Sequence, residues 1–284
     1  MPGRWLALAL VLLGVGAATV AVLGPLMLDV IRYHASEGAL KQVAGGDVAG
    51  LVLVAPVSLI AAFLVWRRHR AGPVLALGPA FYALYVYPQL AVGGEVFRYP
   101  GNSERFFPLF LGLFVLAGAI AVQAWAVTTR LEFPAPSKVV NRAFGWLAIL
   151  IALFLTVGLH LRGLMDAWST QPAGPEYLAD PTLFWLVKFM DLAVVVPALA
   201  VVGAGALRRR PWVATARYAA AGWMALLGSS VAGMAIVMQV EGASGASVAN
   251  TVAFSLFALI GLVIAGFVYG DVVKHAKGKV TNVG

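Results

Sequence analysis

The sequence contains no cysteine and few charged residues. Of its 284 residues, none is cysteine and 11% are charged, against roughly 25% in a typical soluble domain. The absence of cysteine excludes disulfides, thiolate zinc sites, iron–sulfur clusters and cysteine nucleophiles. The shortage of charge means that polar side chains cannot cover a folded domain in water. Lipid is therefore the expected solvent for most of the chain.

The usual signatures of enzymes and of cofactor binding are also missing. There is no nucleophile elbow, no nucleotide-binding fingerprint and no His-Glu-x-x-His metal motif. The spacing from Gly228 to Gly233 is not a phosphate loop, because no Lys-Ser/Thr follows it in this apolar stretch. We therefore expect no cofactor.

Long apolar runs dominate what is present. Eight of them are separated by short polar connections, and each can cross a hydrocarbon core of about 30 Å as a helix. The expected helices cover about residues 5–31, 48–66, 73–94, 106–127, 143–161, 180–211, 213–240 and 248–269. The prediction is an all-α, polytopic transmembrane helix bundle that forms one integral membrane domain over residues 1–284.

Two boundaries near the N-terminus need a choice. The first run resembles a signal peptide, but it continues to Leu28, which is too long for one, so we expect an uncleaved span with a kink at Gly24-Pro25. The polar segment from Arg32 to Asp47 is expected to lie at the surface, where it could form a short helix before the second span.

The positive charge is distributed unevenly. The net charge is +8, and most lysines and arginines fall on one side of the expected topology, including the clusters 67–70 and 208–210 and the lysines of the C-terminal tail. The positive-inside rule therefore predicts cytoplasmic termini and a multi-pass protein of the bacterial plasma (inner) membrane. This asymmetry accounts for the excess charge, so nucleic-acid binding is rejected. Besides the lipid bilayer itself, anionic headgroups at the cytoplasmic face are the expected partners.

A weak internal similarity divides the chain near its middle. Pro56 precedes Arg67 by the same number of residues as Pro197 precedes Arg208. This spacing would fit a parallel four-plus-four repeat with halves 1–130 and 142–284. The alternative is coincidence, because prolines are common in membrane helices and topology alone requires basic turns.

Lys188 and Asp191 are the charged residues that fall deepest in an expected span. Ionisable residues inside a membrane are costly and usually functional. The functional hypothesis is that Asp191 faces a polar cavity open to the outside, where it binds a cation or relays a proton. The alternative is a structural pair, because residues three apart share a helix face and lysine can extend outward.

Further candidates lie near the outer ends of the spans. Tyr82 and Tyr85 could face the same cavity or belong to an interfacial aromatic belt, the interpretation we favour for Tyr87. Asp29, His160 and Arg162 could line an outer vestibule with Asp166, Glu176 and Asp180, or they could be solvated residues at loop edges. A metal site that includes His34 and His160 lacks any diagnostic spacing.

The same region carries a family resemblance. Its residues are Tyr82-Ala83-Leu84-Tyr85, Asp180-Pro181, Met190-Asp191, Val196-Pro197-Ala198 and Arg208-Arg209-Arg210-Pro211-Trp212. Over about residues 72–240 the chain resembles an uncharacterised group of bacterial polytopic integral membrane proteins. The resemblance implies a helix bundle and draws attention to Asp191, but it carries no activity.

Three functional hypotheses follow. The first is a transporter of a small solute or ion, or a related membrane binding protein, with a site of Asp191, Lys188 and the tyrosines. The second is a non-catalytic subunit or sensor that packs against partner membrane subunits. The third is a membrane enzyme for a lipid-linked substrate, with Asp166, Glu176 or His160 as acid or base.

Overall fold

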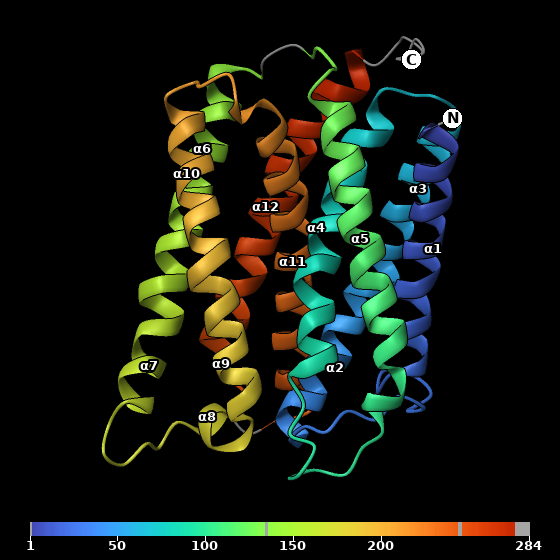
Figure 1. Ribbon diagram of the computed structural model, residues 1–284. Helices are drawn as coiled ribbons and strands as arrows, with labels where there is room; N and C mark the ends of the chain where they lie inside the picture. The colour runs from blue at the N-terminus through green and yellow to red at the C-terminus, as the bar shows by residue number, and fades with distance from the viewer. Residues whose placement is uncertain (1, 134–135, 244–245, 276–284) are drawn as a thin grey trace.

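The computed structural model describes residues 2–133, 136–243 and 246–275. Within these ranges the regular structure is helical, without a strand, and eight helical segments are long and apolar enough to cross a membrane. Figure 1 shows them as a bundle of roughly parallel helices. The prediction of an all-α bundle with eight candidate spans is confirmed, and it indicates a multi-pass membrane protein. Lys277 and Lys279 of the basic tail lie outside the described residues.

The first half of the chain contributes four of the long segments. They are α1 (Pro2–Leu23), a continuous helix made of α2 (Glu37–Ala49), a π-helical segment (Gly50–Val54) and α3 (Ala55–Trp66), then α4 (Ala71–Val92) and α5 (Phe107–Thr128). A 3₁₀ turn, Ser103–Phe106, leads into α5.

The second half contributes the other four. They are α6 (Lys138–Leu153) continued by a π-helical segment (Phe154–His160) and α7 (Leu161–Ala167), then α9 (Pro181–Met190) continued by a π-helical segment (Asp191–Val195) and α10 (Val196–Leu207), and finally α11 (Val213–Val240) and α12 (Val248–His275). The short helix α8 (Pro175–Ala179) lies between α7 and α9.

Three predicted boundaries are wrong. The first helix ends at Leu23 instead of Ile31, because Gly24 and Pro25 open a turn that proline cannot continue as helix. The second begins at Glu37 instead of Val48, because the Ser36 side chain accepts a hydrogen bond from the amide of Ala39 and caps it. The segment expected at 143–161 runs from 138 to 167.

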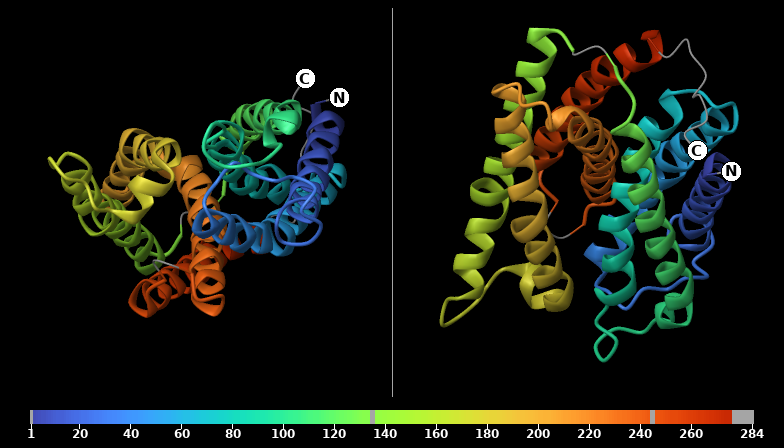
Figure 2. Two further views of the ribbon diagram at one scale, coloured as in Figure 1. Left: turned by 90° about the horizontal axis from the view of Figure 1, so that it is seen from below. Right: turned by 45° about the horizontal axis from the view of Figure 1, so that its top comes forward.

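The helices pack as matching pairs in the two halves. In the first half α1 packs on α3 and α4 on α5, and in the second α6 packs on α10 and α11 on α12. Helix α11 also packs against α2 and α4, which joins the halves. The view from below in Figure 2 shows α6, α7, α9 and α10 as a group set apart from α1 to α5.

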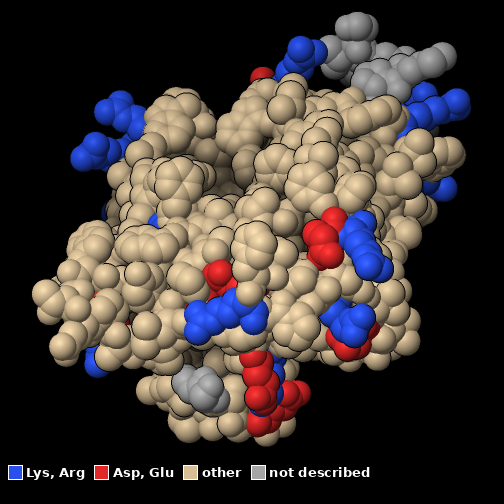
Figure 3. Space-filling view, turned by 60° about the horizontal axis from the view of Figure 1, so that its bottom comes forward, with Lys and Arg blue, Asp and Glu red and all other residues tan. Residues whose placement is uncertain are grey.

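The two ends of the bundle differ in charge. We call the end that carries the turns 67–70 and 208–210 the basic end; α1 begins there and α12 ends there (Figure 1). Figure 3 turns the opposite end forward and shows acidic and basic side chains interspersed over it. The described connections at this end include 24–36, 93–106 and 168–180.

The basic turns repeat one unusual backbone conformation. Arg68 and Arg209 have φ angles of 55° and 53°, in the left-handed region that residues other than glycine seldom occupy. Each turn follows a helix in which a π-helical segment ends two residues before Pro56 or Pro197. Proline lacks an amide hydrogen and clashes with the preceding turn, and the wider π turn accommodates it. The two halves therefore share local geometry at these points.

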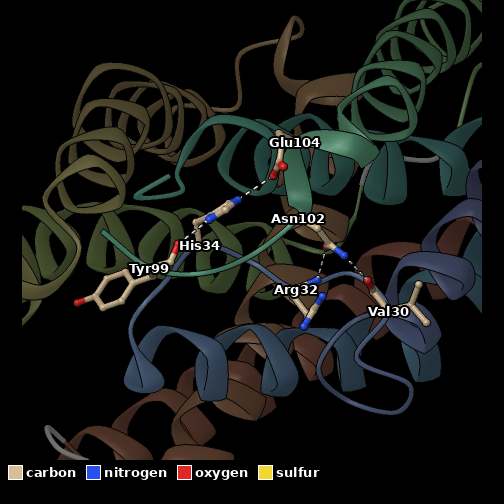
Figure 4. Close-up of polar contacts among 6 residues, drawn as sticks. All are labelled: Val30, Arg32, His34, Tyr99, Asn102 and Glu104. Atoms are coloured by element: carbon tan, nitrogen blue, oxygen red, sulfur yellow. Dashed lines mark hydrogen bonds and ion pairs between the residues drawn. The ribbon is translucent and has the colours of Figure 1, made fainter. Parts of the chain in front are cut away.

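The opposite end is closed by a polar network between two connections (Figure 4). His34 donates through Nδ1 to the carbonyl oxygen of Tyr99 at 2.7 Å, and its Nε2 lies 2.7 Å from Oε2 of Glu104. The side chain of Asn102 accepts from the amide of Arg32 and donates to the carbonyl of Val30, at 2.8 and 3.0 Å. These bonds fix the connection after α1 against the connection before α5.

The histidine in this network should make stability depend on pH. The Tyr99 carbonyl and the Glu104 carboxylate hold the pKa of His34 above its ordinary value of 6.5. A raised pKa in the folded state means that the stabilisation is present below about pH 6.5 and is lost as pH rises through the folded value. We expect the melting temperature in detergent to fall over this range more steeply for the wild type than for His34→Gln. Parallel curves for the two proteins would contradict this expectation.

Glycines allow the closest approach between the halves. A Cβ added at Gly45 of α2 would lie 2.5 Å from the carbonyl oxygen of Gly233 in α11, and one added at Gly233 would lie 2.6 Å from the carbonyl oxygen of Gly45. Small residues of this kind let membrane helices pack backbone to backbone. The contact of α2 with α11 therefore depends on the absence of side chains.

Substitution of Gly45 should separate these helices. We expect Gly45→Ala to lower the free energy of unfolding by about 1–3 kcal/mol, because the methyl group meets backbone that cannot move aside easily. Gly112→Ala in α5 is the matched control, since nothing lies within 4 Å of its added Cβ. Thermal unfolding in detergent should therefore separate the two variants. Equal melting temperatures would show that the glycine contact does not limit packing.

Candidate functional site

A buried carboxylate joins three helical segments in the interior of the bundle. Asp191 Oδ1 accepts a hydrogen bond from the hydroxyl of Tyr85 in α4 at 2.7 Å. Asp191 Oδ2 lies 2.7 Å from Nε2 of His160, at the end of the segment Phe154–His160. Asp191 and His160 are only 4% and 2% exposed. The structure therefore brings together three of the residues predicted from the sequence.

The depth of this cluster makes its hydrogen bonds important. Asp191 follows the start of α9 by ten residues, which corresponds to about 15 Å along a helix axis. This is half of a hydrocarbon core of about 30 Å. An isolated charge at such a depth is costly, and the Tyr85 and His160 contacts satisfy both carboxylate oxygens.

Asp191 and His160 both lie in π-helical segments. The amide of Val196 bonds to the carbonyl of Asp191, and the amide of Leu161 bonds to the carbonyl of Thr156, each five residues earlier. A π segment changes which residues face the interior and often occurs at functional sites. Pro197 explains the segment at Asp191, whereas nothing in the sequence near His160 requires one.

The protonation pattern of His160 follows from its partners. An ionised carboxylate only accepts hydrogen bonds, so Nε2 carries the hydrogen shared with Asp191 Oδ2. The other ring nitrogen, Nδ1, is buried and has no hydrogen-bond partner within the described part of the chain. Nδ1 of His160 is therefore the ring position that its neighbours among the described residues leave without a hydrogen bond.

Lys188 contacts the ring of Phe184 and not the Asp191 carboxylate expected of a structural pair. Its Nζ lies 3.4 Å from the ring centre of Phe184, a cation–π contact. Among the described residues, the ion pairs include none between Lys188 and Asp191. Lys188 is 6% exposed and still interacts electrostatically with Asp191 and Glu176. It therefore contributes positive charge near the site without binding the carboxylate.

Two of the predicted site residues lie away from Asp191. Asp29 is exposed in the turn after α1, which packs against α2, α3 and α5. Arg162 is exposed on α7. Helix boundaries that differ from the predicted ones explain both positions. Helix α1 ends at Leu23, so Asp29 lies outside it, and the helix that contains His160 continues to Ala167, so Arg162 lies within it.

The tyrosines of α4 separate into different environments. Tyr82 is 5% exposed, and its hydroxyl donates to Oγ of Ser230 in α11 at 3.3 Å. Tyr87 is 4% exposed, so its assignment to an interfacial aromatic belt is wrong. Tyr85 alone among these three bonds to Asp191, and its ring packs edge-to-face against Trp223.

The acidic residues expected at a vestibule hold the backbone of the opposite end. Asp166 accepts hydrogen bonds from the amides of Ala173 and Gly174. Asp180 is buried and accepts from the amide and hydroxyl of Ser36. His34 is bound to Glu104 and does not meet His160. Within the described ranges, no group of three or more histidine, aspartate or glutamate side chains is arranged to hold a metal ion.

One buried carboxylate was missed by the sequence analysis. Asp47 is 8% exposed, and its Oδ2 has no hydrogen-bond partner among the described residues. It interacts electrostatically with the hydroxyls of Tyr33, Tyr82 and Tyr87. It follows Glu37, the start of its helix, by the same ten residues that separate Asp191 from Pro181. Ser36 as a helix cap was the signal that could have placed Asp47 inside the span.

Comparison of the chain with protein-family models, with curated proteins and with solved structures finds no match.

The Asp191 cluster predicts a difference between two tyrosines on the same helix. Tyr85→Phe removes a hydrogen bond to a buried carboxylate and should lower the free energy of unfolding by about 2–3 kcal/mol. Tyr82→Phe removes only a longer bond between two neutral hydroxyls and should cost about 1 kcal/mol or less. Thermal unfolding of both variants in one detergent provides the comparison. A Tyr82→Phe variant as destabilised as Tyr85→Phe would contradict the assigned roles.

Proposed function

We propose that this chain is a membrane transporter of a small solute or ion whose intramembrane site is formed by Asp191, His160 and Tyr85, and that transport is coupled to proton binding. The observation that carries the proposal is the buried contact between Asp191 and His160. Two further observations support it: Nδ1 of His160 has no hydrogen-bond partner among the described residues, and the pair lies about half-way along a spanning segment. Lys188 supplies positive charge between the pair and the opposite end.

The proposed setting is the plasma membrane of a bacterium, with both termini in the cytoplasm. The basic end would face the cytoplasm, as the positive-inside rule requires, and would meet anionic lipid headgroups. The opposite end would then face outward. Protons and substrate from outside would reach the site after passing the connections held by His34 and Asp180.

The proposed origin of the fold is a parallel repeat of four spans. Gly50, Pro56 and Arg68 correspond to Asp191, Pro197 and Arg209 at one constant separation of 141 residues. The π-helical segments and the left-handed arginines match at this separation. The same helix pairs also pack within each half. These agreements in backbone conformation are stronger support for duplication than the sequence spacing alone.

The two halves differ where a repeat would make them equivalent. Helix α2 packs on α11 through glycines, whereas its counterpart α9 meets α4 over a shorter length that includes Tyr85 and Asp191. The space-filling surface in Figure 3 is hollowed beside the group formed by α6, α7, α9 and α10. Movement of this group relative to α4 would open and close the site, which is the displacement that alternating access needs.

The proposed exchange uses one pair of groups for two ligands. With His160 neutral, the pair keeps the negative charge of the Asp191 carboxylate and attracts a cationic solute or a metal cation. With His160 protonated at Nδ1 as well, the imidazolium neutralises that charge and the bound cation leaves. Proton and substrate then cross the membrane in opposite directions, because each binds when the other is absent.

Transport assays with reconstituted protein test the proposal. Proteoliposomes that contain a pH-sensitive dye should show proton efflux or uptake when one member of a panel of inorganic cations and small amines is added. Asp191→Asn should abolish this flux. Asp47→Asn is the matched control, because it removes a carboxylate at similar depth and burial, and it should keep the flux. A folded Asp191→Asn protein that exchanges protons at the wild-type rate would refute the proposal.

An enzyme is the second candidate, supported by the same histidine. A carboxylate that orients an imidazole whose other nitrogen is free is the arrangement of a general base. Such an enzyme would act on a lipid-linked substrate that enters from the membrane. Product formation from labelled lipid by the wild type, lost in His160→Gln and independent of a proton gradient, would favour it over a transporter.

A further inference from the structure

A pocket at the basic end is lined by four cationic side chains. It has a volume of about 590 Å³ and lies between residues 128–133, Pro136 and Lys138 on one side and the turn before α11 on the other. Its cationic residues are Lys138, Arg209, Arg210 and Arg217, and Glu132 is its one acidic residue. Among the described residues, none of these four cations forms an ion pair with a carboxylate. The pocket therefore has an excess of positive charge.

Arg217 differs from the other three because it is buried. It is 7% exposed, whereas Lys138, Arg209 and Arg210 are exposed at the mouth. Its Nη1 donates to Oδ1 of Asn141 at 3.3 Å, and its guanidinium lies 5.3 Å from the ring centre of Tyr218. Its Nε is buried without a hydrogen-bond partner in the described part of the chain. A buried guanidinium without a counter-ion is costly, so an anion bound beside Arg217 would be stabilising.

The surroundings hold Arg217 in position for such an anion. Asn141 donates through its side-chain amide to the carbonyl of Ala206, which leaves its oxygen facing Arg217. Thr128, which also lines the pocket, is 2% exposed and its hydroxyl has no partner among the described residues. The left-handed backbone of Arg209 turns the chain at the mouth. Beneath the exposed cations, the residues that line the pocket thus include a buried N–H donor and a buried hydroxyl, neither with a hydrogen-bond partner among the described residues.

We propose that this pocket binds a phosphate-bearing anion, with Arg217 as the buried ligand and Lys138, Arg209 and Arg210 at the entrance. Guanidinium groups match the geometry of phosphate oxygens. The phosphate could belong to an anionic phospholipid headgroup or to free phosphate in the aqueous phase. The site stands apart from Asp191 and does not depend on the proposed transport activity.

Thermal unfolding with added ligands tests the site and separates the two sources. The wild type in a neutral detergent is titrated with phosphatidylglycerol, with phosphatidylcholine as the control lipid, and separately with sodium phosphate against sodium chloride at equal ionic strength. Stabilisation by phosphatidylglycerol alone identifies a lipid headgroup, and stabilisation by sodium phosphate identifies free phosphate. No stabilisation by either would overturn the proposal.

Variants then assign the binding to this pocket. Arg217→Gln should raise the apparent dissociation constant by roughly 10- to 100-fold, as expected for the loss of charge-assisted hydrogen bonds. Arg130→Gln is the matched control, because it removes an exposed cation from the same connection and should leave affinity within about twofold. Arg210→Gln at the entrance should weaken binding several-fold. Because Arg210 is exposed, this substitution leaves the interior unchanged, and it still tests the site if Arg217→Gln fails to fold. Equal affinities for Arg130→Gln and Arg210→Gln would contradict the proposed site.

Discussion

The contact of the Asp191 carboxylate with Tyr85 and His160 is the constraint on which much of the structure depends. A carboxylate near the middle of a membrane needs partners for both oxygens, and the partners here come from two other segments of the chain. The bond to Tyr85 ties α9 and α10 to the first half, and the bond to His160 ties them to α6 and α7. When both oxygens of Asp191 are hydrogen-bonded, the segments that carry Tyr85 and His160 must lie against the segment that carries Asp191.

The same contact forms the smaller of two connections between the halves. Helix α11 is fixed to α2 by glycine contacts between backbones, and such contacts leave little room for adjustment. Helix α9 and the π-helical segment after it meet α4 over a shorter length, where Asp191 bonds to Tyr85. The proposed transport requires this second connection to move while the first stays fixed. The Arg217 pocket at the basic end is lined in part by residues of the connection between the halves.

The sequence predicted the number of candidate spans because apolar runs of about 20 residues record it directly. It misplaced the ends of several helices, since Ser36 as a cap and Pro25 in a turn act locally and override the average hydropathy. Asp191, Tyr85 and His160 were found as candidates from depth and residue type. That they bond to one another was not predictable, because the π-helical turns that orient Asp191 and His160 leave no clear periodicity. Asp47 was missed because the helix that Ser36 caps was expected to begin at Val48, after Asp47. The burial of Arg217 was not predictable because it depends on packing between distant segments.

The central claim is that Asp191 holds His160 with its hydrogen on Nε2 and leaves Nδ1 without a hydrogen-bond partner among the described residues. Nitrogen-15 NMR of histidine-labelled protein in nanodiscs tests it most directly, with the His160 signals assigned by their loss in His160→Gln. The account predicts a neutral imidazole with its hydrogen on Nε2 in the wild type, and a changed ratio of the two neutral tautomers in Asp191→Asn. A His160 ring with its hydrogen on Nδ1, or with the same tautomer ratio in folded Asp191→Asn, would contradict it.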